Sequence, residues 1–159
     1  IETKIKWPND IVADGKKICG ILTEMSADPD AIHYVVIGAG INVNLQEIPE
    51  ELKTAATSLQ ILTGKKFHRA ELISRCMKEF ERCYGIFLKT EDMTWLMDEY
   101  NEILINRDKR VCVLEPKGQY TGTALGIDKN DELIVRKDDG EIVSVYAGEV
   151  SVRGVYGYV

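Results

Sequence analysis

The chain has 159 residues, of which 45% are hydrophobic and 29% are charged, and its formal net charge is −6. This composition excludes a disordered chain, and the negative charge argues against a nonspecific nucleic-acid surface. The apolar segments are shorter than the ~20 residues of a membrane helix, so the sequence predicts no membrane contact and a cytoplasmic protein. Any DNA-binding module would lie outside this chain.

A strand and a turn are predicted at the start of the chain. Residues 3–7 alternate apolar side chains with lysines, as in a half-buried strand, and Pro8 cannot continue a central ladder. The chain is therefore expected to turn at Asn9 and Asp10 and to enter a second strand at 11–12.

A hairpin is predicted next. Asp-Gly at 14–15 separates the second strand from the apolar run 18–22, and this dipeptide is typical of a tight turn between strands. The hairpin reverses the chain direction. Lys17 is therefore expected to return to the Asn9 and Asp10 end.

A glycine-containing strand follows. Residues 33–37 form a β-branched run that stops at the glycine-containing stretch 38–40, and alternation resumes over 41–44. Together they predict one central strand with an open backbone. The pattern lacks the third glycine of a dinucleotide fingerprint, and no helix pattern follows it. Because glycine lets a strand backbone approach a flat ligand, we expect Gly20 and Gly38 to open a slot between neighbouring strands.

Two helices are predicted in the middle of the chain. Apolar residues recur with helical spacing from Arg69 to Leu88, which predicts an amphipathic helix. A second helix is expected from Thr94 to about Ile105, with Thr94 as a candidate N-cap. The aromatic and methionine side chains of both helices are expected in the core.

Short alternating strands are predicted in the last third of the chain. They cover residues 110–115, 119–127, 132–136, 141–146 and 149–153, and most are separated by turns at 116–118, 128–131 and 138–140. Five strands at this spacing suggest a small antiparallel barrel.

The cysteines and histidines indicate no metal or disulfide chemistry. No Cys-x-x-Cys spacing is present, and the cysteines lie in apolar patterns that favour reduced core thiols. His33 and His68 have no ligand cluster beside them, so we interpret them as surface or half-buried imidazoles. The cysteines are Cys19, Cys76, Cys83 and Cys112.

Three motifs occur in order in the first third of the chain. They are Lys-Trp-Pro-Asn-Asp-Ile at 6–11, Lys-Ile-Cys-Gly-Ile-Leu-Thr-Glu at 17–24 and Ile-Gly-Ala-Gly-Ile-Asn-Val-Asn at 37–44. Together they resemble the catalytic domain of biotin protein ligases, and the tail from about 110 to 152 resembles the small C-terminal β-domain of that family. The family's basic glycine-rich loop lies upstream of the first motif, so we interpret the chain as a C-terminal portion of a longer protein.

The resemblance implies an α+β fold. Residues 1–107 would be the C-terminal portion of a class II synthetase-like biotin/lipoate ligase core, with a mixed or antiparallel sheet and packed helices. Residues 108–159 would form the C-terminal β-barrel. The piece by itself is expected to be weakly active or inactive.

The resemblance also implies a two-step reaction with biotin, ATP and Mg²⁺. Biotin would be activated to biotinyl-adenylate and then transferred to a lysine of a biotin carboxyl carrier domain. Lys17 matches the catalytic lysine, and Asp10 could hold magnesium or orient Lys17. The matched nucleotide-side residues are Lys6, Asn9, Asp10 and Asn42, and the matched biotin-pocket residues are Lys17, Gly20, Leu22 and Gly38.

Several alternatives stay open from the residues themselves. Asn9 and Asp10 after proline are good turn residues, Lys6 could point to solvent, and Leu22 could be ordinary strand packing. Trp7 is interpreted as a packing residue under the turn. The segment 48–59 resembles a surface loop that lies near the adenylate in relatives.

The expected partners are the carrier domain of a biotin-dependent carboxylase and a second copy of the protein, since relatives often dimerise. DNA is expected only if an N-terminal domain exists outside this chain. A biotin-responsive transcriptional repressor is an added role, and a lipoate-attaching relative is the alternative enzyme.

Overall fold

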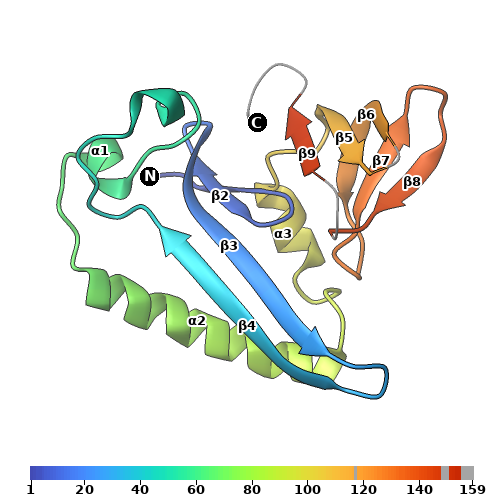
Figure 1. Ribbon diagram of the computed structural model, residues 1–159, viewed down its shortest axis with the longest axis horizontal. Helices are drawn as coiled ribbons and strands as arrows, with labels where there is room; N and C mark the ends of the chain where they lie inside the picture. The colour runs from blue at the N-terminus through green and yellow to red at the C-terminus, as the bar shows by residue number, and fades with distance from the viewer. Residues whose placement is uncertain (117, 148–150, 155–159) are drawn as a thin grey trace.

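The computed structural model describes residues 1–116, 118–147 and 151–154, and along the chain they form an antiparallel sheet, a helical segment and a second antiparallel sheet (Figure 1). The first sheet contains β1 (Lys4–Lys6), β2 (Asp10–Ala13), β3 (Lys16–Ala27) and β4 (Ile32–Ile41). The helices are η1 (Glu50–Leu52), α1 (Leu59–Thr63), α2 (Arg69–Thr90) and α3 (Met97–Ile103). The second sheet contains β5 (Arg110–Glu115), β6 (Gly118–Ile127), β7 (Leu133–Lys137), β8 (Ile142–Val145) and β9 (Ser151–Gly154).

The first sheet has the order β1-β2-β3-β4. The predicted hairpin turn is confirmed, since Asp14 and Gly15 both have positive φ, at 49° and 72°. The prediction of one strand that passes through the glycines is confirmed as far as Ile41, but its expected central place is not found among the described residues. β4 continues to Ile41 and lies at the edge of the described sheet, because its glycines stay extended and pair with β3.

The pairing of β2 with β3 contains a β-bulge. Asp10 lies opposite Gly20 and Ile11 opposite Cys19, but Val12 lies opposite Lys17. Ile18 is therefore an extra residue on β3, and a bulge of this kind changes the face on which the preceding side chain lies.

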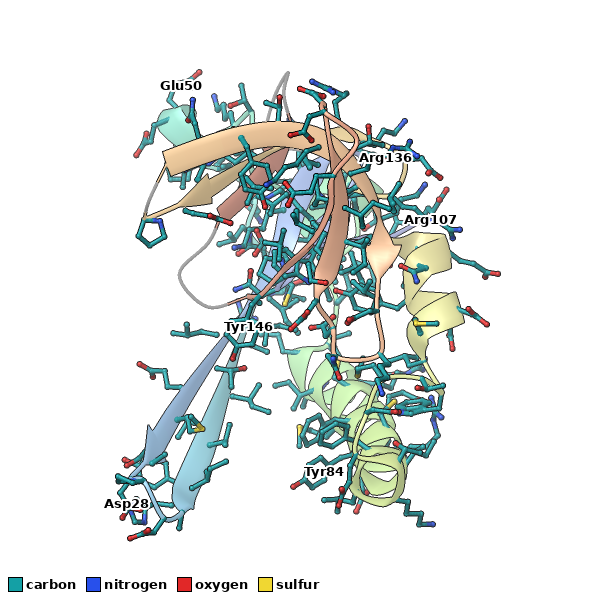
Figure 2. All side chains as sticks on the ribbon, turned by 90° about the vertical axis from the view of Figure 1, so that its right-hand side faces the viewer. Asp28, Glu50, Tyr84, Arg107, Arg136 and Tyr146 are labelled. Carbon is teal, nitrogen blue, oxygen red and sulfur yellow. The ribbon has the colours of Figure 1, made fainter. Side chains whose placement is uncertain are left out.

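Helix α2 confirms the predicted helix, but the expectation that its apolar side chains are buried is wrong. None of its residues is buried, and Met77 and Phe80 are 56% and 44% exposed. Figure 2 shows α2, which carries Tyr84, and the β3–β4 hairpin, with Asp28 near its tip, extending away from the second sheet. No described element covers this face of the helix.

Two further local predictions need correction. The second helix begins at Met97 rather than at Thr94, because the Thr94 hydroxyl group donates to the Asp92 carboxylate and does not cap the helix. The core assignment is right for Cys19, which is buried, and wrong for Cys76, which lies exposed on α2. Within the described residues, no helix is long and apolar enough to cross a membrane.

The second sheet is open rather than a closed barrel. Its order is β8-β7-β6-β5-β9, and pairing between β8 and β9 is not found among the described residues. Residues 149–150 of the last predicted strand and residue 117 of a predicted turn lie outside the described residues. Side chains of this sheet pack together in an apolar core.

That core includes the tryptophan of the first motif. Trp7 is fully buried among side chains of the second sheet and of the segment that precedes it, which confirms its predicted packing role. The buried members of this core are Trp7, Leu104, Val111, Val113, Ala124, Ile127, Leu133, Val135, Val145 and Val152.

Candidate active site

Lys17 and Asp10 form an ion pair where β2 meets β3. The Lys17 Nζ lies 2.5 Å from the Asp10 Oδ1, and the side chains are 38% and 12% exposed. The hairpin therefore brings Lys17 back to the first turn, as the sequence predicted. A charge pair that is partly shielded from water interacts more strongly than one on the open surface.

Lys6 lies close to this pair and is buried rather than solvent-facing. It is 7% exposed and lies opposite Asp10 in the β1–β2 pairing. Burial lowers the pKa of Lys6, and Lys17 and Arg153 lower it further, whereas Asp10 opposes the shift. Lys6 and Lys17 therefore both lie close to the Asp10 carboxylate.

The side-chain amide groups of Asn9 and Asn42 donate hydrogen bonds to backbone carbonyl groups. The Asn9 Nδ2 donates to the Ile21 carbonyl at 2.7 Å, and the Asn42 Nδ2 donates to the Thr57 carbonyl at 3.0 Å. Neither bond is visible in the sequence, because each joins segments 12 or 15 residues apart. Both residues hold the loops on either side of Lys17 in place.

The segment 55–57 lies directly beside Lys17. The Lys17 N–H donates to the Ala55 carbonyl at 2.8 Å, and the Thr57 N–H donates to the Lys17 carbonyl at 2.9 Å. An open pocket of 820 Å³ adjoins this segment and is lined in part by Lys16 and Lys53. The loop predicted near the adenylate is thus attached to the residue predicted to be catalytic.

The predicted biotin-pocket residues lie on β3 and β4. Leu22 is opposite Gly38, whereas Gly20 is opposite Gly40, so the two predicted glycines are not direct partners. Leu22 is 61% exposed, which argues against simple strand packing among the described residues.

A pocket of 520 Å³ lies between the two sheets. It brings together Lys6, Asn9, Asp10 and Leu22. The other predicted site residues are not part of its lining, namely Lys17, Gly20, Gly38 and Asn42. Asp131 also lines it, and the sequence prediction missed this residue because it lies in a turn of the second sheet.

Asp131 is a carboxyl group in an unusual environment. Burial raises its pKa to about 6, and the charge of Asp128 adds to the shift. Its Oδ1 is buried without a hydrogen-bond partner among the described residues. The backbone carbonyl of Asp131 accepts a hydrogen bond from the Trp7 indole at 3.0 Å, so this turn lies directly over the first motif.

Of the carboxylates in this site, only Asp10 was predicted to bind magnesium, and a single carboxylate does not form a complete set of metal ligands. Asp10 lines the pocket, and Mg²⁺ commonly takes one or two carboxylates together with substrate phosphates. Among the described residues, no cluster of three acidic, cysteine or histidine side chains is suited to a metal ion. The residues fit an ion that arrives with a nucleotide.

Two family models match the chain. Residues 1–42 match the biotin/lipoate A/B protein ligase family, and residues 108–153 match the biotin protein ligase C-terminal domain. The first match contains the Lys17 and Asp10 pair, and the second covers most of the second sheet.

Curated relatives match along nearly the whole chain. The bifunctional ligase/repressor BirA of Bacillus subtilis is 40% identical over 156 residues, which are 96% of this chain and 47% of the relative. The biotin–[acetyl-CoA-carboxylase] ligase of Mycobacterium tuberculosis is 37% identical over 150 residues, 94% of this chain and 53% of the relative. The chain spans about half the length of these relatives.

Solved structures agree with the fold. The apo biotin protein ligase from Aquifex aeolicus superposes with a TM-score of 0.86 at 31% identity, covering 97% of this chain and 66% of that one. The same enzyme in complex with biotin and ATP gives a TM-score of 0.83 at 30% identity, covering 97% and 63%. The motifs, the two family matches and this shared architecture agree, and the chain belongs to the biotin protein ligase family.

Proposed function

We propose that the protein containing this chain is an ATP-dependent biotin protein ligase. It activates biotin to biotinyl-adenylate with release of pyrophosphate, and it then transfers biotin to a lysine of a carrier domain. The observation that carries the proposal is the Lys17 and Asp10 pair, set beside a pocket that the first motif lines. The solved relative that holds biotin and ATP supports the same pair of substrates.

Lys17 would supply the positive charge that the first step needs. The carboxylate of biotin and the phosphates of ATP are both anionic, so their approach is costly where water is excluded. A fixed cation offsets that repulsion and stabilises the charge that builds on the transferring group. Asp10 holds the ammonium group in place, and Lys6 adds a second positive charge nearby.

The remaining predicted residues would divide between the two substrates. Asn9, Asp10, Lys6 and Asn42 would serve the nucleotide side, with the amides acting mainly by holding the loops around Lys17. Gly20, Leu22 and Gly38 would form the biotin side on β3 and β4. Magnesium would be held by Asp10 together with the phosphates of ATP.

The acceptor would be the carrier domain of a biotin-dependent carboxylase, as the name of the Mycobacterium tuberculosis relative indicates. A repressor role is the second candidate, because the Bacillus subtilis relative is named a bifunctional ligase/repressor. That role would add to ligation, with dimerisation and a DNA-binding module elsewhere in the protein, rather than replace ligation.

The test is biotin- and ATP-dependent pyrophosphate release by the intact protein, with lipoate offered as the competing acid. We expect release with biotin only, and a loss of at least ~100-fold in Lys17→Ala, because a positioned charge stabiliser is removed. Lys65→Ala is the control, since Lys65 is an exposed lysine outside the ion pair and outside the pockets described above.

Two results would contradict the proposal. A preference for lipoate would move the protein to the lipoate-attaching relatives, and normal turnover of Lys17→Ala would remove Lys17 from the mechanism.

A further inference from the structure

The β-bulge at Ile18 determines which way Lys17 points. In a regular strand, residues three apart face opposite sides, so Lys17 and Gly20 would be separated by the sheet. Asp10 and Val12, two apart on β2, share a face, and their partners on β3 are Gly20 and Lys17. The extra residue therefore places Lys17, Gly20 and Asp10 on the same face.

Lys17 then crosses directly over Gly20 to reach Asp10. A Cβ atom built on Gly20 would lie 2.6 Å from both the Cε and the Nζ of Lys17, and 3.4 Å from the Asp10 Oδ1. No real side chain fits at such a distance unless the lysine moves. The absence of a side chain at Gly20 therefore leaves the space that the end of the Lys17 side chain occupies.

The neighbouring glycines have no such role. A Cβ on Gly40, which lies opposite Gly20, would meet only the Gly20 carbonyl at 3.7 Å, and a Cβ on Gly38 would meet only the Leu22 carbonyl at 3.8 Å. Both are ordinary contacts. The steric demand at Gly20 therefore comes from Lys17 and Asp10, not from the pairing of β3 with β4.

We infer that Gly20 is a positioning residue for Lys17, and that its missing side chain serves the Lys17 and Asp10 pair rather than only the wall of a biotin pocket. This inference rests on the proposed function. The atoms that Gly20→Ala displaces belong to the far end of a flexible side chain that is 38% exposed, so the lysine can swing into solvent without disturbing the strand. The variant should fold normally and lose the ion pair.

The experiment compares Gly20→Ala with Gly40→Ala in the intact protein. We expect Gly20→Ala to lower kcat for pyrophosphate release by about 10- to 100-fold at saturating biotin and ATP, because a small displacement of a reacting group is costly. The melting temperature should stay close to wild type, and any rise in KM for biotin should be smaller than the fall in kcat. Gly40→Ala should match wild type in all three quantities.

A double variant shows whether Gly20 acts through Lys17. In a Lys17→Ala background, adding Gly20→Ala should change the single-turnover rate by less than about two-fold, since the group it displaces is already gone.

Three results would overturn the inference while leaving the proposed function intact. The first is a rise in KM for biotin without a loss of kcat, and the second is a fall in melting temperature that Gly40→Ala does not show. The third is a further loss of single-turnover rate when Gly20→Ala is added to Lys17→Ala. Failure of the proposed function would look different, because wild type itself would then show no biotin-dependent release.

Discussion

Asp131 is a carboxyl group whose protonation is linked to folding. Its folded pKa, about 6, lies above the ordinary value of 3.8, so the folded state keeps a proton that the unfolded state releases. The folded state therefore binds more protons between these values, and the free energy of unfolding falls as pH rises through this range. Above about pH 6 the loss from this group is complete.

Replacement of Asp131 by asparagine should remove that dependence. We expect Asp131→Asn to raise the free energy of unfolding at pH 7 by about 1–3 kcal/mol, with little change near pH 4. Asparagine tolerates the positive φ of 62° at this position, so the turn is retained. Urea unfolding at a series of pH values measures the effect.

Asp108→Asn is the matched control for this prediction. Asp108 also has a positive φ, at 58°, but its side chain is 79% exposed, so the pH profile of unfolding should stay unchanged. If the free energy of unfolding of Asp131→Asn depends on pH as it does in wild type, the protonation of Asp131 is not linked to folding.

At the residue scale, the sequence predicts which residue types form the candidate site better than it predicts their hydrogen-bond partners. The Asp-Gly turn at 14–15 was enough to bring Lys17 to Asp10, because a hairpin closes over a few residues. The bonds from Asn9 to Ile21 and from Asn42 to Thr57 depend on strand register and on a loop path, which no local pattern encodes. The residue types were readable, but their hydrogen-bond partners were not.

At the scale of elements, β1 and the adjacent Trp7 connect the first sheet to the segment that leads into the second sheet. The Trp7 N–H donates to the Asn106 Oδ1 at 2.9 Å, and Asn106 is only 3% exposed. The Ile105 N–H also donates to the Ile5 carbonyl at 2.8 Å. The segment that leads into the second sheet therefore runs alongside the strand that carries the first motif.

Removal of the Asn106 side chain should weaken this junction. Asn106→Ala leaves the buried Trp7 N–H without its acceptor, which typically costs about 1–3 kcal/mol of unfolding free energy. Asn130→Ala, in an exposed turn, is the control and should stay within about 0.5 kcal/mol of wild type. Chemical denaturation of the intact protein measures both, and equal stabilities would show that the bond contributes nothing.

Strong periodicity explains which elements were predictable. Helix α2 and the strands of the second sheet follow clear repeats of 3.6 and 2, so their existence was foreseen within a few residues. Closure of the second sheet depends on pairing between its edge strands, and the bulge at Ile18 depends on one extra residue in a register. No local sequence pattern encodes either feature, so the predicted barrel is not found among the described residues and the bulge was missed.

At the scale of the molecule, the described residues leave a large apolar surface uncovered. On β4 and α2, side chains that include Tyr34, Val36, Met77 and Phe80 are between 44% and 61% exposed. Exposed apolar side chains in this number favour association or aggregation.

The 159-residue chain expressed by itself should therefore bind a hydrophobic dye and self-associate. We expect Met77→Lys together with Phe80→Lys to lower dye fluorescence and the apparent mass by light scattering, because both positions lie on the exposed face of α2. Glu71→Gln together with Glu79→Gln, at charged positions of the same helix, is the control, because these two changes make the net charge more positive by the same amount. If the Met77→Lys and Phe80→Lys double variant keeps the dye fluorescence and apparent mass of the unchanged chain, this face of α2 does not cause the self-association.

The indole of Trp7 also limits which C-terminal sheets from other family members can replace the second sheet of this protein. A C-terminal sheet taken from a relative would have to bring a cavity shaped for that ring, with a carbonyl acceptor at the position of Asp131. Excision of the sheet would leave the ring in water and release the strand next to Lys6 and Asp10. Chimeras between family members should therefore succeed when the cut follows the contacts of Trp7 rather than the linear order of the sequence.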